Sequence, residues 1–489
     1  MSKRNFKILI IVLLILALIA FLYFYFYKKP AGPAGTGDDA NSYSGFGNGG
    51  GKNNGSDNNS PTDISGTGGT GTNQPVPKLR KVSSMPVAGF GIFTKERFKE
   101  VPAAAPASDP APAATTSPSA SATDMDADYA GDAEGSGTYT PVTPPKSSAP
   151  ATSPAPLKPA AKTTAKSPSA PTTEFVTAVR YAARATGNIY QTFADTLNEQ
   201  KFSSTIIPKI YDAYFDSKAE SVVMRYLKND QETIETFAGV LPKELLAGDT
   251  TGNNELKGSF LGEGITDISM SADLQKIFYL IDISDTATGV TSGYLGDKKT
   301  EVFNSPFTEW LSQWPNANMV TITTKPASGY PGYMYWFDPA KQDLQQVLGN
   351  INGLTDLTSP DGKIVLYSND QLGLSLYNVA SKNVIPVGLR TMPEKCVWTK
   401  ASTALYCFVP KTLIPNNQYP DDWYKGKISF SDQIWSMNAL DGTVSLVADP
   451  ISFPGGEEID GTKPALDKDG RYLFFVNKKD SFLWEFDLQ

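Results

Sequence analysis

"PKLRKVSSMPVAGFGIF" (residues 77–93) is a short basic and apolar island between two stretches of low complexity. Residues 30–76 before it are mostly Gly, Asn, Ser and Thr, and residues 102–173 after it are mostly Pro, Ala, Ser and Thr. Neither flank has enough apolar side chains to offset the entropy of ordering the backbone, so we expect two disordered linkers. The island itself has the pattern of two strands that meet at Pro86.

The chain from Glu174 onward consists of aromatic and β-branched runs separated by tight polar turns, without a long amphipathic pattern. This texture predicts an all-β fold. A unit of short strand, polar turn and apolar strand recurs at 214–227, 268–280, 311–322, 357–368, 397–408 and 465–476. A third strand with aromatic residues and a fourth edge strand follow most of these units. Four antiparallel strands that recur every roughly 40 to 60 residues predict the blades of a β-propeller.

The turn "SPDGKIVLYS" (359–368) gives this repeat its most specific sequence. Pro presets φ at the first turn position, and Asp and Gly tolerate the later positions. The segment resembles the repeats of the periplasmic Tol-system propeller and of the wider tryptophan–aspartate-repeat class. The resemblance covers residues 207–489 and implies a fold, without implying an activity. The whole layout is also similar to that of uncharacterised bacterial proteins with one anchor, a low-complexity stalk and a propeller.

The island supplies two strands that the repeats lack. The last repeat, 471–489, has no fourth strand, and the first, 174–196, has a second and a third strand but no first. Residues 78–84 are therefore expected to close the last blade, and residues 86–93 to form the innermost strand of the first blade, because propellers close their ring in this way. The alternative is that the island is an apolar patch within a disordered linker.

The strand count predicts a seven-bladed β-propeller, or six blades if the least regular segment, 255–305, is misread. The domains expected on this basis are a basic segment and anchor (1–29), a linker (30–76), the closing and first strands (77–101), a disordered insertion (102–173) and the remaining propeller (174–489).

The N-terminus has the pattern of a transmembrane helix. A basic segment precedes an unbroken apolar run of 20 residues from Ile8 to Tyr27, which as a helix is about 30 Å long, the thickness of the hydrocarbon core of a bilayer. Aromatic residues gather at its C-terminal end before Lys28 and Lys29, as at a membrane interface. We expect a retained single-pass anchor in the cell membrane with the propeller on the extracytoplasmic side. A cleaved signal peptide is the alternative.

The composition excludes several classes of chemistry. The chain has no histidine and a net charge of −8, so Ser-His-Asp, Cys-His and imidazole–metal sites are absent and nucleic acid is not the expected partner. No phosphate-binding loop, dinucleotide fingerprint or nucleophile elbow occurs. We therefore expect no cofactor and no metal, and we assign no catalytic residue.

The two cysteines, Cys396 and Cys407, flank the turn at Ala401 and Ser402. If the hairpin pairs symmetrically about that turn, the cysteines face each other, and a cross-strand disulfide would suit an extracytoplasmic domain. The alternative is a pair of buried free thiols.

A long excursion between the second and third strands of one blade, residues 409–435, is the candidate binding loop. It carries Tyr419, Asp421, Asp422, Trp423 and Tyr424. Aromatic side chains beside carboxylates suit the capture of a peptide, a cationic group or a sugar face. The alternative is that Trp423 folds back onto its own blade.

These patterns favour a non-catalytic binding or scaffolding module for an unidentified protein, peptide or glycan. The alternative is a carbohydrate-active or lyase propeller that uses paired carboxylates. The acids available for such a pair are Asp421, Asp422, Asp432, Glu457, Glu458 and Asp460.

Overall fold

The computed structural model describes residues 78–99, 172–243 and 254–489. The predicted anchor Ile8–Tyr27, the linker 30–76 and nearly all of the insertion 102–173 lie outside the described residues. Within the described ranges, no helix is long and apolar enough to cross a membrane.

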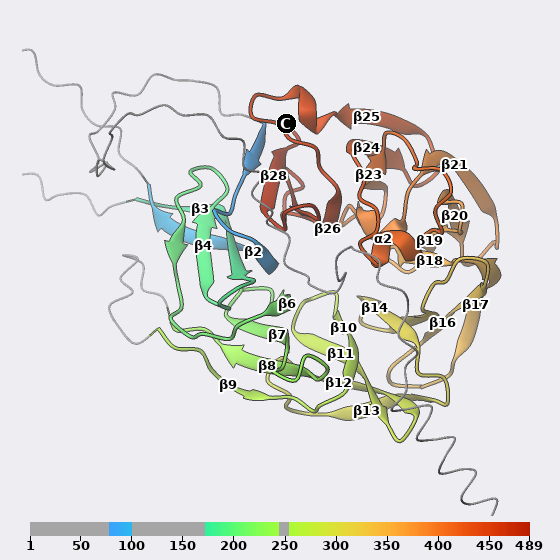
Figure 1. Ribbon diagram of the computed structural model, residues 1–489, viewed down its shortest axis with the longest axis horizontal. Coiled ribbons are helices and arrows are strands. Elements are labelled where there is room, and N and C mark those ends of the chain that lie inside the picture. The colour runs from blue at the N-terminus through green and yellow to red at the C-terminus, as the bar shows by residue number, and fades with distance from the viewer. Residues whose placement is uncertain (1–77, 100–171, 244–253) are drawn as a thin grey trace, which may run out of the picture. The chain divides into compact units, whose positions relative to one another are not determined.

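Seven antiparallel sheets of four strands each follow one another around a central axis (Figure 1). The prediction of an all-β, seven-bladed β-propeller is confirmed, and the six-bladed alternative is wrong. The segment 255–305, expected to be the least regular, contains a complete sheet of four strands. Its third strand, Thr286–Gly293, has no aromatic residue, which explains why the repeat is weak there in sequence.

The first four blades run in chain order from the innermost to the outermost strand. Blade 1 contains β2 (Val87–Phe98), β3 (Thr173–Ala183), β4 (Ile189–Phe193) and β5 (Gln200–Lys201). Blade 2 contains β6 (Ile210–Phe215), β7 (Ser221–Leu227), β8 (Ile234–Val240) and β9 (Lys257–Phe260). Blade 3 contains β10 (Ile265–Met270), β11 (Lys276–Ile283), β12 (Thr286–Gly293) and β13 (Thr300–Ser305). Blade 4 contains β14 (Trp310–Asn316), β15 (Met319–Thr324), β16 (Pro331–Phe337) and β17 (Gln345–Asn352).

The last three blades include the strand that closes the ring. Blade 5 contains β18 (Thr355–Thr358), β19 (Ile364–Ser368), β20 (Gly373–Asn378) and β21 (Val384–Arg390). Blade 6 contains β22 (Cys396–Trp398), β23 (Ala404–Pro410), β24 (Asp432–Asn438) and β25 (Val444–Ala448). Blade 7 contains β26 (Gly461–Leu466), β27 (Tyr472–Asn477), β28 (Leu483–Asp487) and, from the N-terminal side of the chain, β1 (Leu79–Lys81). In the parts of the chain that the structure describes, the connections contain three short helices: η1 (Pro393–Lys395), α2 (Asp421–Tyr424) and η2 (Pro450–Ser452).

The island at residues 77–93 provides both missing strands. β1 pairs antiparallel with β28, so that Leu79 stands opposite Phe486 and Arg80 opposite Glu485. The Arg80 guanidinium forms an ion pair with the fully buried Glu485 carboxylate and also donates to the Ala194 carbonyl of blade 1. The expected closure of the last blade by the N-terminal strand is confirmed, and this closing strand also contacts the first blade.

Apolar side chains on both faces of the middle strands hold the blades together. Every residue of β27 is buried, because blades 6 and 1 cover the two faces of the blade 7 sheet. The ring of Phe408 in blade 6 lies 4.6 Å from that of Phe475, measured between centroids. Position 461, beside this contact, requires glycine, because a Cβ atom there would lie 2.2 Å from the Phe408 ring. Such interlocking makes each blade depend on its neighbours.

β2 and β3 form a ribbon that is longer than the inner hairpins of the other blades. Their pairing continues past Thr94 and Thr177 as far as Phe98 and Thr173. The ion pair between Arg97 and Glu174, 2.8 Å between charged atoms, fastens its outer part. The insertion therefore joins the first and second strands of blade 1, at the end of the ring where every blade makes its first turn.

Candidate binding site at the mouth of the central channel

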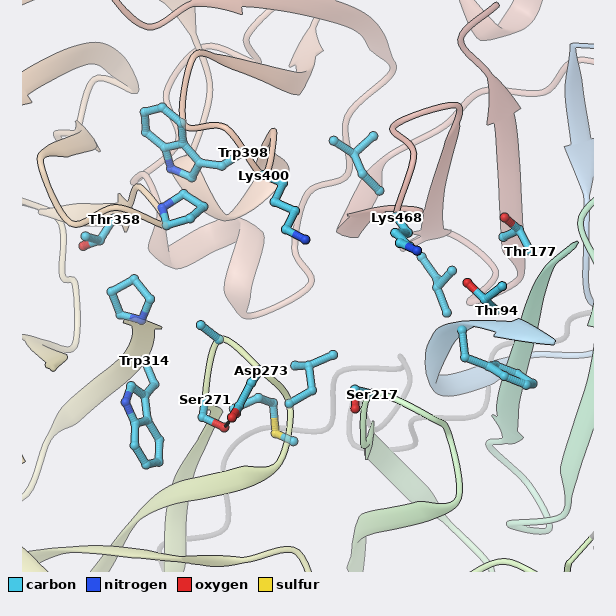
Figure 2. Close-up of a pocket in the computed structure, with 18 residues that line it drawn as sticks. Thr94, Thr177, Ser217, Ser271, Asp273, Trp314, Thr358, Trp398, Lys400 and Lys468 are labelled. Atoms are coloured by element: carbon cyan, nitrogen blue, oxygen red, sulfur yellow. Dashed lines mark hydrogen bonds between the residues drawn. The ribbon is translucent and has the colours of Figure 1, made fainter. Parts of the chain in front are cut away.

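A cavity of about 550 Å³ opens at the end of the ring formed by the first turns (Figure 2). All seven blades contribute to it: blades 2 to 7 from the end of their first strand or from the turn that follows, and blade 1 from the middle of β2 and from Thr177 of β3. Its position on the axis follows from this seven-fold contribution, because only the innermost strands reach the centre of a propeller.

The wall of the cavity is largely apolar. Trp314 and Trp398 reach its edge from blades 4 and 6, but each is only 7% exposed, and both indoles pack into apolar clusters between blades. The Trp398 indole is fixed by a hydrogen bond from Nε1 to the Leu357 carbonyl, 3.3 Å. Pro315, Pro360, Met270, Leu274 and Leu466 complete the apolar lining. Rigid aromatic and proline surfaces bind a partner with little loss of side-chain entropy.

Two carboxylates of the surrounding turns, those of Asp273 and Asp361, accept hydrogen bonds within their own turns. Asp361 accepts hydrogen bonds from the Ser359 hydroxyl (2.7 Å) and from the Lys363 backbone N–H (3.1 Å). Asp273, the one carboxylate that lines the cavity, accepts from Ser271 Oγ at 2.6 Å, and this bond lowers the pKa of Asp273. These acids stabilise the tight turns that the sequence repeat encodes.

Two lysines give the cavity an available positive charge. Lys400 and Lys468 are exposed and line the opening from blades 6 and 7. Within the described part of the chain, neither ammonium group has a hydrogen bond or an ion pair with protein atoms. Figure 2 shows the Lys400 side chain reaching toward the middle of the opening. Both ammonium groups can therefore donate to an anionic ligand.

The ribbon of blade 1 extends this site outward. Thr94 and Thr177 line the central cavity and also a side groove of about 370 Å³ between the ribbon and blade 7. Phe175, 73% exposed, lines that groove together with Asp469 and Arg471. A ligand seated in the central cavity can thus continue along the ribbon over an exposed aromatic side chain.

The predicted binding loop lies at the opposite end of the ring, because β23 runs away from the first turn. The structure brings its five residues together as a packed unit. Trp423 is 5% exposed and Tyr419 is 6% exposed, and both belong to an apolar cluster with Leu372, Met392 and Phe430. Asp422 is buried as well, and Tyr424 is the member with substantial exposure, 41%. Trp423 is folded back onto the propeller, where its contacts include residues of blades 5 and 7 and not only of its own blade, and the binding role of this loop stays a prediction.

A buried charge centre beneath Trp423 holds the excursion in place. Lys395 is completely buried and forms ion pairs with Asp432 (2.8 Å) and with Asp460. Asp460 also accepts from Trp423 Nε1 at 2.9 Å and from the Phe430 backbone N–H at 3.0 Å. Burial disfavours the charged ammonium, but the two carboxylates outweigh it and raise the pKa of Lys395. The centre joins blades 6 and 7 and is closed to solvent.

Three acids at this end of the ring have raised pKa values. Burial raises the pKa of Asp432 to about 6, with Lys395 acting in the opposite direction. Burial raises the pKa of Asp356 to about 6 and that of Glu394 to about 7. The Tyr424 hydroxyl donates to Glu394 Oε2 at 2.7 Å. These groups titrate near neutrality but belong to the packed interior.

Each acid considered for a catalytic pair has a lysine partner in the structure. The pairs are Asp421–Lys425, Asp422–Lys427, Asp432–Lys395, Asp460–Lys395, Glu457–Lys81 and Glu458–Lys479. Of these acids, Asp432 and Asp460 share one partner, Lys395, and both are fully buried. No group of three or more His, Cys, Asp or Glu side chains among the described residues is arranged to hold a metal ion.

Cys396 and Cys407 stand opposite each other on β22 and β23 and form a disulfide, with 4.0 Å between their Cα atoms. Both sulfurs lie in the apolar cluster shared by blades 5 and 6. The bond therefore ties the innermost strand of blade 6 to its neighbour.

The central cavity was not among the sites predicted from sequence. Its members are spread from Ile92 to Lys468 and meet only when the ring closes. The repeated turn is the sequence feature that could have predicted this cavity, because the first turns of the blades surround one mouth of the central channel.

No protein-family model matches the chain, and no curated protein matches it. Similar solved structures include an oligogalacturonate lyase in complex with manganese (9% identity, TM-score 0.42, 64% of this chain and 85% of that one). Others are an oligogalacturonate lyase from Vibrio parahaemolyticus (8%, TM-score 0.41, 63% and 85%) and a functionally unknown protein from Desulfotomaculum acetoxidans (15%, TM-score 0.38, 63% and 89%).

Similarity at these values does not support an argument about activity. The resemblance to Tol-type and tryptophan–aspartate-repeat propellers also stays a prediction.

Proposed function

We propose that this chain is a non-catalytic binding module, anchored in the cell membrane by Ile8–Tyr27, with its propeller on the extracytoplasmic side. The ligand is a polypeptide segment that carries apolar and acidic side chains, and it binds in the cavity at the mouth of the channel. The observation that carries the proposal is the pairing of an apolar lining with two lysines, Lys400 and Lys468, that have no ion pair or hydrogen bond among the described residues. This combination suits a partner with hydrophobic anchors and negative charge.

Binding is favoured over carboxylate catalysis by the state of the acids. Glycoside chemistry needs two carboxyl groups that flank a substrate in an accessible cleft. The single carboxylate that lines the cavity, Asp273, is held within its turn, and the buried pair Asp432 and Asp460 is closed off by Trp423. A polypeptide partner needs neither group.

The test is in-cell crosslinking and affinity capture with the tagged full-length chain. The test variant is Lys400→Ala/Lys468→Ala, and the matched control is Lys201→Ala/Lys257→Ala, which removes two exposed lysines from the outermost strands β5 and β9. We expect a defined partner whose capture falls about tenfold in the test variant, since each exposed charge contributes up to about 1 kcal/mol. The control should capture it as the unchanged chain does. Equal capture by both variants would move the contact elsewhere on the ring and favour a scaffolding role.

A further inference from the structure

The insertion between β2 and β3 begins and ends beside the central cavity. The Lys99 backbone N–H donates to the Thr172 carbonyl at 2.8 Å, so the two ends of the segment 100–171 are held together. The ribbon that carries them starts from the cavity wall at Thr94 and Thr177. Five residues of strand from Thr94 to Lys99 place these ends about 15 Å from the wall.

The insertion contains one strongly acidic stretch. Residues 124–134, "DMDADYAGDAE", hold five carboxylates and no lysine or arginine. Met125 and Tyr129 give the same stretch two large apolar side chains. Residues 124–134 therefore match the ligand proposed above, a polypeptide segment with acidic and apolar side chains.

The cavity offers the complementary groups. Lys400 and Lys468 donate to no protein atom within the described ranges, whereas the turn acids Asp273 and Asp361 already accept hydrogen bonds within their turns. The lining of the cavity is largely apolar, and the residues that give it this character beside the buried tryptophans are Met270, Leu274, Pro315, Pro360 and Leu466 (Figure 2). Carboxylates at the rim and apolar side chains against the wall would thus find partners together.

We propose that the cavity binds residues 124–134 of its own chain as a tethered ligand. This inference rests on the proposed function of the cavity. Reach is not limiting, because the 25 residues from Lys99 to Asp124 can span up to about 85 Å. A tethered ligand has an effective concentration on the order of millimolar, so even weak binding fills the site. A partner in trans must then compete with the insertion. Capture of that partner should therefore depend on the concentration of the partner and on the negative charge of residues 124–134.

The direct test is zero-length carbodiimide crosslinking of the full-length chain, which joins a lysine amine to a carboxylate in contact with it. We expect crosslinks from Lys400 and Lys468 to residues 124–134 in at least fivefold excess over crosslinks from the control lysines Lys201 and Lys257. Mixing 14N- and 15N-labelled chains separates links within a chain from links between chains. The variant Met125→Ser/Tyr129→Ser keeps all five carboxylates and should lower the yield several-fold if the stretch lies against the apolar wall.

Three results would overturn the inference: links spread evenly over exposed lysines, links only between chains, or a yield unchanged by Met125→Ser/Tyr129→Ser. Partner capture shows whether such a result contradicts only the tethered ligand or also the proposed function of the cavity. If capture depends on Lys400 and Lys468 while the intrachain links are missing, the cavity binds a partner and the tethered ligand is wrong. If the links form, replacing the acids of residues 124–134 by their amides should increase partner capture at least threefold, and unchanged capture would exclude competition.

Discussion

Among single residues, Trp423 has the clearest energetic role. Its indole donates to Asp460, and its ring lies over the ammonium groups of Lys395 (5.1 Å) and Lys478 (4.4 Å). These contacts make the side chain a cover for the buried ion pairs. Removing it would open a cavity and expose charges that the fold has desolvated.

We therefore expect Trp423→Ala to lower the free energy of unfolding by about 3–5 kcal/mol. The matched control is Tyr424→Phe, which removes only the hydroxyl bonded to Glu394 and should cost about 0.5–1.5 kcal/mol. Urea denaturation of both variants measures the difference. Similar small losses in the two variants would show that Trp423 is not the cover of the charge centre.

Asp356 predicts a dependence of stability on pH. Its raised pKa, about 6, means that the folded state holds the proton more tightly than the unfolded state, whose Asp titrates near 3.8. The contribution of Asp356 to the free energy of unfolding should therefore be largest below about pH 4. It should fall by about 2–3 kcal/mol as the pH rises to 6 and stay level above that. Other buried acids also change the free energy of unfolding with pH. The contribution of Asp356 is therefore measured as the difference in this free energy between the unchanged chain and Asp356→Asn.

At pH 4 the two chains should be equally stable, because a protonated Asp and an Asn are both neutral. At pH 7 Asp356→Asn should be the more stable by about 2–3 kcal/mol. The exposed Asp469→Asn, which removes one surface carboxylate from a turn of blade 7, serves as the control for the loss of one charge. Parallel curves for the chain and Asp356→Asn would contradict the raised pKa.

At the scale of elements, the pairing of β1 with β28 depends on one buried ion pair. Glu485 is fully buried, so removing Arg80 leaves a charge without its partner. We expect Arg80→Ala to lower the free energy of unfolding by about 3–5 kcal/mol. Lys81→Ala, which loses surface ion pairs with Glu457 and Asp480 and the contacts of its ammonium group with two aromatic rings, should cost no more than about 2 kcal/mol.

A double replacement separates charge from packing at this position. Arg80→Leu/Glu485→Leu removes both charges and should recover most of the stability lost in Arg80→Ala, because paired apolar side chains can substitute for a buried ion pair. Chemical denaturation of the set tests this. If the double variant is as unstable as Arg80→Ala, the Arg80 bond to the Ala194 carbonyl, and not the buried charge, is what matters.

The hairpins were predictable because their determinants are local. The Ser359–Gly362 turn and the strands beside it follow from residues within ten positions of each other, and the closing strand follows from a count of strands. The charge centre was not predictable, since Lys395 finds Asp460 across 65 residues and two blades. No periodic pattern marks a lysine that will be buried. The same reasoning applies to Lys400 and Lys468, whose common cavity exists only in the closed ring.

At the scale of the whole molecule, one short strand makes the ring continuous. Leu79 and Val82 are each 4% exposed; Leu79 packs between blades 6 and 7, Val82 packs between blades 7 and 1, and the backbone of β1 covers the edge of β28. Burial of two such side chains and a buried ion pair together amount to more than about 5 kcal/mol, which is comparable to the stability of a typical domain.

A chain that begins at Pro86 should accordingly behave differently from one that begins at Gln74, the first residue of the compact unit. We expect the longer chain to be monomeric and the shorter one to unfold at least 10 °C lower and to associate through the exposed edge of β28. Scanning calorimetry and size-exclusion chromatography measure both effects. A peptide of residues 78–85 added in trans should restore the monomer by pairing with β28. If the chain from Pro86 keeps the melting temperature and size of the longer one, the ring is held by blade packing alone, and β1 serves only to position the chain that enters blade 1.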